Sequence, residues 1–316
     1  MSKLTFKRYW SLAGTASIFV GMYFVIAIIA GFVFLTGTNA LAIATQSAVV
    51  MLIGCGEFFT IVIAGIDLSV GSAVALTGMV TAKLMVSGMN PILGFVLGAV
   101  VCGALIGILN GSLVNLTGVH PFIITLGTLS VFRGVTLVIS NAAPVFGFSQ
   151  AFKTAFGGTV LSWVPMPVVV ALIVAALLYF VTSKTVFGRN LYAIGGNREA
   201  AYFSGINVKR HTLLVFIISG VCAGIAGSVT ISRLGAAEPL AAVGYETQAI
   251  AAVIIGGASF FGGKGKVPNI LIGALIIGLI ANGLNMMGVE TYYQQIATGS
   301  LIIVAVVLDQ MIAGKK

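Results

Sequence analysis

Charged residues are scarce in this chain: only 7% of its 316 residues are Asp, Glu, Lys or Arg, whereas 59% are hydrophobic. Soluble domains have roughly a quarter of their residues charged, so the mean hydropathy of +1.14 excludes a soluble enzyme and predicts an integral membrane protein. The net charge of +9 could suggest nucleic acid, but the basic residues flank apolar stretches, which is typical of topology control in a membrane. We therefore expect no nucleic acid among its partners.

Cysteine and histidine, the usual metal ligands, are also few. The three cysteines, Cys55, Cys102 and Cys222, lie in apolar stretches without a CxxC pair, so neither a disulfide nor a metal site is expected. His120 and His211 have no carboxylate or cysteine at the spacing of a metal site or catalytic triad. Both histidines are therefore predicted to have structural or surface roles.

A phosphate-binding loop is missing as well. The run GGKGK at 262–266 has no glycine five residues before either Gly-Lys pair, and neither lysine is followed by Ser or Thr. We predict that the chain has no catalytic residue, metal or cofactor of its own. If ATP drives it, another subunit must hydrolyse that ATP.

Long apolar runs dominate what is present. Windows of about twenty apolar residues give ten candidate transmembrane spans, near 13–36, 44–65, 70–88, 91–114, 121–140, 164–183, 212–232, 246–260, 268–288 and 292–312. The apolar run that follows Met1–Trp10 is too long for a signal-peptide core, so it is predicted to be an uncleaved first helix. The fold expected is an all-α polytopic membrane protein forming one domain over residues 1–316.

The distribution of Lys and Arg predicts the orientation. Basic residues gather in the polar segment 184–211, at the N-terminus, at Lys264 and Lys266, and at Lys315 and Lys316. Loops rich in Lys and Arg stay on the cytoplasmic side, and ten spans place all four regions there. Both termini and the segment 184–211 are thus expected in the cytoplasm.

An internal repeat relates the two halves of the chain. Gly103–Val119 (GALIGILNGSLVNLTGV) and Gly273–Val289 (GALIIGLIANGLNMMGV), 170 residues apart, share eight of seventeen positions. Five spans separate the copies, so they cross the membrane in opposite directions, as in the inverted repeats of transporters. We expect two inverted five-helix halves, 1–163 and 164–316. A duplicated scaffold without a transport role is the alternative interpretation.

Polar residues interrupt the apolar spans at a few places. Glu57 lies mid-span and needs a partner or a water-filled cavity. Asp67, in IAGIDLSVGS, is either a helix N-cap or part of a polar path. Comparable breaks flank the eighth span, at AVGYETQ (242–248) and GGASFFGG (256–263), and transporter substrate sites tend to form at such breaks. The candidate pathway residues are Glu57, Asp67, Ser69, Thr125, Gln248 and Ser259.

Four motifs together carry a family resemblance: GIDLSVGS (65–72), GVHPFIITLGT (118–128), FGRNLYAIGGNREAAYFSGINV (187–208) and GGASFFGGKG (256–265). From about the second span to the C-terminus the chain resembles the permease subunits of bacterial ATP-driven importers for monosaccharides, the ribose, galactose, arabinose, xylose and allose group. Two departures, Thr247-Gln248 after GYE and His120, leave the sugar open.

The resemblance implies a partner for the segment 184–211. In that family the stretch equivalent to NREAAYFSGIN is a cytoplasmic coupling segment that docks on the ATPase. The resemblance implies that the coupling residues of this chain are Asn197, Glu199, Ala200, Ala201, Ser204 and Gly205. The residues themselves predict a short helix that Gly205 can end, with Ala200 and Ala201 as candidates to face the ATPase.

The implied protein is a multi-pass permease of the bacterial inner membrane. Its expected partners are a cytoplasmic ATP-binding subunit, a periplasmic sugar-binding protein and a second copy of the permease. The alternatives are a self-sufficient secondary transporter or channel for a small polar solute, or a permease of the same type for autoinducer-like or other polyol cargo. An ion-coupled carrier would need intramembrane carboxylates, for which only Glu57 and Asp67 are available.

Overall fold

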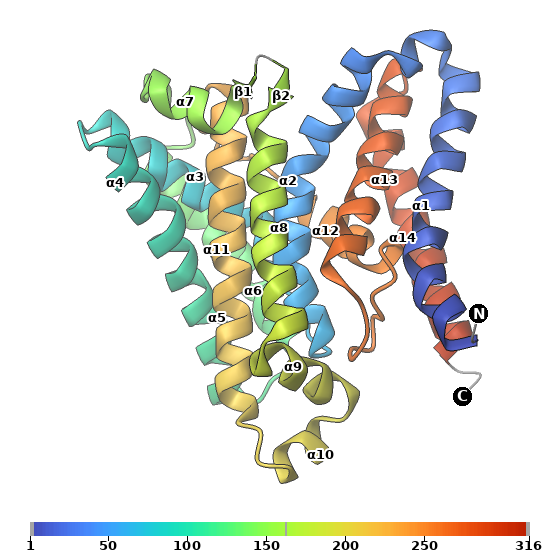
Figure 1. Cartoon of the computed structure of the whole chain (residues 1–316). Coiled ribbons are helices and arrows are strands. Elements are labelled where there is room, and N and C mark those ends of the chain that lie inside the picture. Colours follow the sequence, from blue (N-terminus) through green and yellow to red (C-terminus); the bar gives the residue numbers. More distant parts are fainter. Residues whose placement is uncertain (1–2, 162, 314–316) are drawn as a thin grey trace.

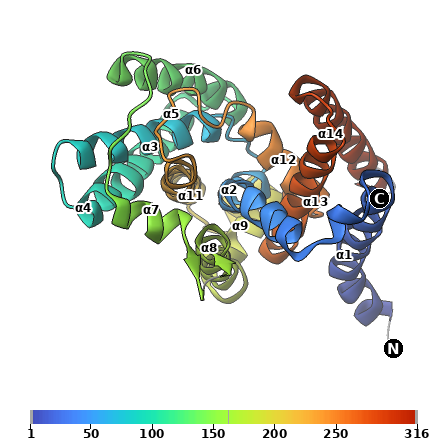
Figure 2. The same ribbon diagram turned by 90° about the horizontal axis from the view of Figure 1, so that it is seen from above.

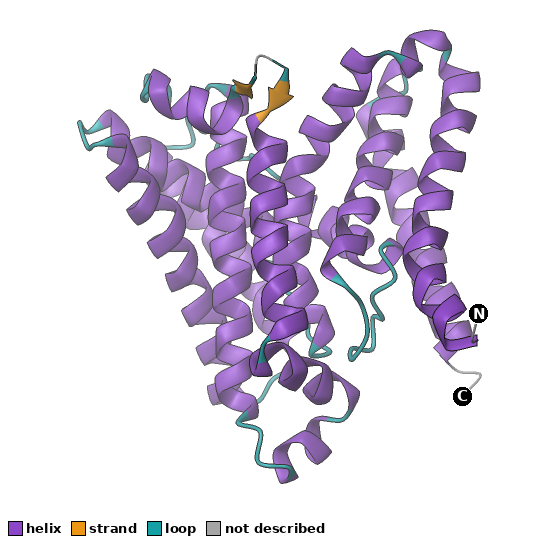
Figure 3. Ribbon diagram, viewed as in Figure 1, coloured by secondary structure: helices purple, strands orange, loops and turns teal. Residues whose placement is uncertain are grey.

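The computed structural model describes residues 3–161 and 163–313. Most of the described chain is helical, and its one strand pair, β1 with β2, is antiparallel and only two residues long on each side (Figure 3). The elements are α1 (Lys3–Ala30), the 3-10 helix η1 (Phe32–Leu35), α2 (Gly37–Val62), α3 (Val70–Val86), α4 (Pro91–Phe95), the π-helix η2 (Val96–Val101), α5 (Cys102–Thr117), α6 (Pro121–Ser140), α7 (Gln150–Gly157), β1 (Thr159–Val160), β2 (Val164–Pro165), α8 (Met166–Lys184), α9 (Val186–Gly196), α10 (Arg198–Phe203), α11 (Val208–Leu234), α12 (Tyr245–Ile255), α13 (Val267–Met286) and α14 (Thr291–Ala313).

Six helices in the described part of the chain are long and apolar enough to cross a membrane. They are α2, the continuous helix Pro91–Thr117 formed by α4, η2 and α5, and α6, α8, α11 and α13. Three shorter apolar helical stretches, Gly14–Ala30, Val70–Val86 and Tyr245–Ile255, accompany them. The expected all-α, multi-pass membrane architecture is confirmed.

The helices alternate in direction through one bundle (Figure 1). Following the chain, α2 and α4–α5 run toward the end that carries α9 and α10, whereas α11 and α13 run away from it. Helices α1 and α6 run away from that end, and α8 and α14 run toward it. As a result, α1 begins and α14 ends on the side of α9 and α10, and α7 with β1 and β2 lies at the opposite end.

Helices α2 and α11 form the centre of the bundle (Figure 2), and they are the most buried of the long apolar helices. Small residues explain how closely α11 approaches α5, because a Cβ added at Gly103 or Gly107 would overlap the backbone of α11. Gly220 and Gly224 of α11 are crowded in the same way by α5 and η2. Glycines one helical turn apart thus let these helix backbones approach closely.

Some helix boundaries differ from the expected spans because glycines end the helices earlier. The span expected at 13–36 is broken at Gly31, whose φ is 90°, and α2 begins only at Gly37. Likewise α12 ends at Ile255, before Gly257 with φ 83°. The span expected at 121–140 coincides with α6, which His120 caps by accepting a hydrogen bond from the Phe122 N–H (3.3 Å).

Candidate functional site

The polar segment 184–211 folds into two short helices, α9 and α10, that project from one end of the bundle (Figure 1). Asn197 separates them and caps α10, since its Oδ1 accepts a hydrogen bond from the Ala200 N–H (2.9 Å). At the other end, the Ser204 Oγ donates to the Ala200 carbonyl (2.8 Å), and Gly205 takes a left-handed φ of 84°. The predicted short helix with a stop at Gly205 is therefore confirmed.

The two alanines of α10 have different environments. Ala200 and Glu199 are exposed, but Ala201 is only 4% exposed and packs in a core cluster that includes Leu191 and Val208. The expectation that both alanines face a partner is wrong for Ala201. A helix of six residues resting on the bundle must turn one face inward, and Ala201 lies on that face.

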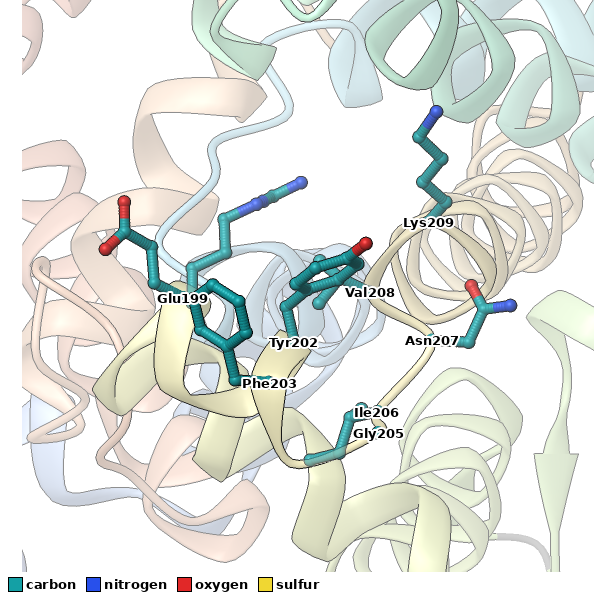
Figure 4. Close-up of a pocket in the computed structure, with 9 residues that line it drawn as sticks. Glu199, Tyr202, Phe203, Gly205, Ile206, Asn207, Val208 and Lys209 are labelled. Carbon is teal, nitrogen blue, oxygen red and sulfur yellow. The ribbon is translucent and has the colours of Figure 1, made fainter.

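The exposed face of α10 carries two aromatic residues that the sequence analysis did not single out. Tyr202 and Phe203 are 66% and 83% exposed, with ring centroids 5.6 Å apart in an edge-to-face arrangement. They line a groove of about 950 Å³ between α10 and the start of α11, with Glu199 and Lys209 on its rim (Figure 4). The available signal was a pair of adjacent aromatics inside an otherwise polar, water-facing stretch.

Helix α9 anchors this segment to the bundle through glycine contacts. The Gly263 N–H donates to the Val62 carbonyl at the end of α2 (2.9 Å), and Gly195 packs so closely that an added Cβ would overlap both groups. The Tyr192 hydroxyl donates to the Gly265 carbonyl (3.0 Å). Burial raises the pKa of Tyr192, with a smaller effect of Tyr179, so the phenol keeps the proton that it donates.

His211 also supports the segment. Its ring stacks on Phe187 with centroids 5.3 Å apart, and its Nε2 lies 3.1 Å from the Asn190 amide nitrogen. Helices α9 and α11 are thus joined at the base of the projection. The predicted structural role of this histidine is confirmed.

A second candidate region is a buried polar cluster around the α2–α3 loop. It consists of Glu57 on α2, Asp67 and Ser69 in the loop, Asn110 on α5, Thr125 on α6 and Ser219 on α11. The loop closes on itself, because the Asp67 N–H donates to Glu57 Oε1 (3.0 Å) and the Ser69 hydroxyl donates to Asp67 Oδ1 (2.6 Å).

Groups from distant helices complete this cluster. The Ser219 hydroxyl donates to Asp67 Oδ2 (2.9 Å), and the Asn110 amide donates to the Ser69 hydroxyl (2.8 Å). The Leu68 N–H donates to the Thr125 hydroxyl (3.0 Å). Four of the predicted pathway residues, Glu57, Asp67, Ser69 and Thr125, are therefore brought together. Asn110 and Ser219 were missed, since nothing near them in the sequence marks them.

This cluster is sealed from solvent. Asp67 is 2% exposed, and Glu57, Ser69 and Thr125 have no exposed surface. Its bonds hold the loop that leads into α3, where Ser69 and not Asp67 occupies the N-cap position. The N-cap interpretation of Asp67 therefore needs correction: its carboxylate accepts from the N-cap residue instead, through the Ser69 N–H and hydroxyl.

The remaining two predicted pathway residues lie elsewhere. Gln248 is half-buried on the first turn of α12. Ser259 is 6% exposed in the α12–α13 loop, where its N–H donates to the Lys264 carbonyl (3.3 Å) and its hydroxyl accepts from the Phe261 N–H (3.3 Å). Ser259 therefore shapes the loop that contacts α9.

Within residues 3–161 and 163–313, no group of three or more His, Cys, Asp or Glu residues could hold a metal ion. The chemistry available is hydrogen bonding and charge, arranged on a bundle with one projecting aromatic surface. Such an arrangement can bind a partner.

Comparison with known proteins gives a consistent result over nearly the whole chain. Residues 39–306 match the family described as the permease component of branched-chain amino acid transport systems. The D-allose transport system permease protein of Escherichia coli (strain K12) is 54% identical over 308 residues, covering 98% of this chain and 94% of the relative.

More distant relatives cover similar lengths. The ribose import permease protein of Bacillus subtilis (strain 168) is 40% identical, covering 92% of this chain and 91% of the relative. The galactose/methyl galactoside import permease protein of Escherichia coli (strain K12) is 36% identical, with both chains fully covered. No solved structure matches.

Proposed function

The chain belongs to the branched-chain amino acid transport permease family, and from this premise we propose that it is the permease subunit of an ATP-driven monosaccharide importer in the bacterial inner membrane. The observation that carries the proposal is the 54% identity to a D-allose permease along almost the entire length of both chains. The subunit translocates sugar and is not itself an enzyme. A separate ATP-binding subunit and a sugar-binding protein are its partners.

D-Allose is the sugar to test first. The D-allose relative is more similar to this chain than the ribose and galactose permeases described above. The chain, expressed with its ATP-binding and sugar-binding partners in cells that lack other permeases for these sugars, is expected to support uptake of radiolabelled D-allose, with D-ribose and D-galactose as competitors. Absence of ATP-dependent uptake for all three sugars would contradict the proposal, and uptake of an autoinducer-like polyol alone would favour the rival cargo.

Two inverted halves of five spans each are the proposed architecture. Two observations support it: the opposite directions of α4–α5 and α13 (Figure 1), and the matching glycines that follow them, Gly118 with φ 68° and Gly288 with φ 71°, at the same offset of 170 residues. The short helices α3 and α12 also fall at corresponding places of the two halves. We further propose that two copies of the chain form the translocation unit.

The end of the bundle with α9 and α10 is proposed to face the cytoplasm. Lys184, Arg189 and Arg198 lie in this region, and α1 begins and α14 ends on the same side (Figure 1). The basic residues Lys315 and Lys316, which the sequence analysis used, lie outside the described residues. The opposite end, with α7, β1 and β2, then faces the periplasm and meets the sugar-binding protein.

Helix α10 is the proposed docking element for the ATP-binding subunit. Tyr202 and Phe203 present large apolar surface in a segment that lies in water, and exposed aromatic anchors of this kind dominate protein interfaces. The capping by Asn197 and Ser204 holds the helix in place before the partner arrives, which lowers the entropic cost of binding.

The docking role has a direct test. Phe203→Ala removes the most exposed anchor, and Ala200→Asp adds a charge to the same face. Both substitutions are expected to reduce sugar uptake and co-purification of the ATP-binding subunit together. For Phe203→Ala, the free energy of binding to the ATP-binding subunit should weaken by about 1–4 kcal/mol. The matched control is Val186→Ala, at a residue of α9 that is 62% exposed. Normal uptake and normal co-purification in both α10 variants would refute the docking role.

A further inference from the structure

The sealing of the polar cluster leaves open which residues a passing sugar contacts. Glu57 and Asp67 accept hydrogen bonds inside the bundle and have almost no exposed surface. In this conformation no solute can contact either carboxylate. Polar groups on the membrane-spanning helices that stay partly exposed are therefore the better candidates for contact with the sugar.

Arg133 and Glu246 are charged residues on these helices that remain partly exposed. Arg133 lies two-thirds of the way along α6, and its Nη1 donates to the carbonyls of Pro239 and Ala241 in the α11–α12 loop, both at 2.9 Å. Glu246 lies in the first turn of α12 and within electrostatic range of Arg133. The two side chains thus join the two halves of the chain at one point.

A glycine at the start of α3 leaves room for the Glu246 side chain. The Glu246 carboxylate occupies the space beside Gly71 at the start of α3, where any side chain would overlap it. The α11–α12 loop descends from the end of α11 to α12, which lies at mid-height in the bundle (Figure 1). The first turns of the two short helices α3 and α12 therefore meet here, and Gln248 lies on the same turn of α12 as Glu246.

Partly exposed charges at this position need water or a polar partner beside them. Charged groups within membrane-spanning segments face a protein interior or a water-filled cavity rather than lipid, and non-helical backbone at membrane depth is tolerated where it is buried in protein or lines such a cavity. The α11–α12 loop is such backbone, and Arg133 and Glu246 are such charged groups, each with part of its surface exposed. The exposed side of Arg133 and Glu246 is thus a polar surface inside the membrane.

We propose that Arg133, Glu246 and Gln248 line the translocation route and hydrogen bond to the hydroxyl groups of the monosaccharide. This inference rests on the proposed function and adds the residues that contact the cargo. The guanidinium donates, the carboxylate accepts and the amide does both, so the three together match a sugar hydroxyl, which is donor and acceptor at once. Short helices that break at corresponding places of two halves are where such sites are built in transporters.

Accessibility to water gives the first test. In a chain whose three native cysteines are replaced by serine, Gln248→Cys should react with a charged, membrane-impermeant thiosulfonate reagent during turnover, and saturating D-allose should slow the reaction. The controls are Ser69→Cys, which is sealed, and Leu177→Cys, which is exposed on an apolar surface of α8. Neither control should react with the charged reagent. Labelling of Gln248→Cys no faster than that of these controls would overturn the proposal.

Sugar transport gives the second test. It compares the Glu-to-Gln substitution at the partly exposed Glu246 with the same substitution at the buried Glu57. Glu246→Gln is expected to reduce the maximal rate of uptake at least tenfold and to change the ratio of D-allose to D-ribose uptake. Glu57→Gln should leave that ratio unchanged. Where Glu246→Gln fails to accumulate in the membrane, Gln248→Leu is measured in its place with the same expectation.

The outcomes separate this inference from the function on which it rests. If the unmodified chain with its partners imports no monosaccharide, the proposed function fails. If it imports sugar but the ratio is unchanged in Glu246→Gln and in Gln248→Leu, only the assignment of these residues fails.

Discussion

Gly195 offers a sharp test of how the projecting helices are coupled to the bundle. It lies one residue from the end of α9, against the Val62 carbonyl of α2 and the Gly263 N–H of the α12–α13 loop. Its neighbour Gly196 has no atom within 4 Å of the position where a Cβ would be added. The two glycines therefore provide a matched pair, Gly195→Ala and Gly196→Ala, that differs in contact alone.

The expected magnitude follows from these contacts. Both substitutions gain roughly 1 kcal/mol of helix propensity at most. At Gly195 the added methyl group collides with backbone that cannot rotate away, and overpacking of this kind costs about 1–3 kcal/mol. The difference corresponds to a shift of roughly 5- to 150-fold between a docked and a displaced α9.

The assay compares three properties of the purified complex: sugar uptake, sugar-stimulated ATP hydrolysis and retention of the ATP-binding subunit. Gly195 lies on α9, away from the aromatic surface of α10, so the Gly195→Ala complex should keep its ATP-binding subunit while uptake per ATP hydrolysed falls. Gly196→Ala should behave like the unmodified chain. If the two variants are indistinguishable in uptake per ATP, the contact between α9, α2 and the α12–α13 loop carries no coupling.

Two other predictions concern the buried cluster and the orientation. Asp67→Ala removes the acceptor of three hydrogen bonds, from the Ser69 N–H, the Ser69 hydroxyl and the Ser219 hydroxyl. Thermal unfolding in detergent should therefore show that the free energy of unfolding falls by at least about 2 kcal/mol. The control Glu199→Ala, on the exposed face of α10, should change stability little. A single cysteine at Arg198 should react with an impermeant reagent added from the cytoplasm. A single cysteine at Gln150, which is exposed at the start of α7, should react with the reagent added from the periplasm. Reaction of both cysteines from one side would contradict the proposed orientation.

Features set by local sequence were predictable. The span at 121–140 coincides with α6 because a proline follows a capping residue at its start and an apolar run of spanning length continues from there. The short helix α10 was predicted because Asn197 and Gly205 mark its ends within a few residues. In both cases the signals lie inside the element that they define.

Features that depend on distant neighbours were not predictable. The sequence shows two alanines side by side, and only the position of α10 on the bundle decides that Ala201 is buried while Ala200 is exposed. The sequence places Tyr202 and Phe203 in a water-facing segment, but only the fold shows that both side chains point away from the bundle. The helix break at Gly31 was not predictable either, because the run remains apolar on both sides of it.

The carboxylates illustrate this limit most clearly. Glu57 and Glu246 are both acidic residues in apolar surroundings, and the sequence favoured Glu57 as the functional one because it lies in mid-span. In the folded chain Glu57 is sealed beside Asp67, whose carboxylate is held by a serine 152 residues away. Glu246, whose carboxylate lies beside Gly71, stays partly exposed. A buried carboxylate held by hydrogen bonds fixes a loop, and an accessible one at a break between helices can meet a solute. The difference between the two roles therefore depends on what packs around each group, not on its depth along a span.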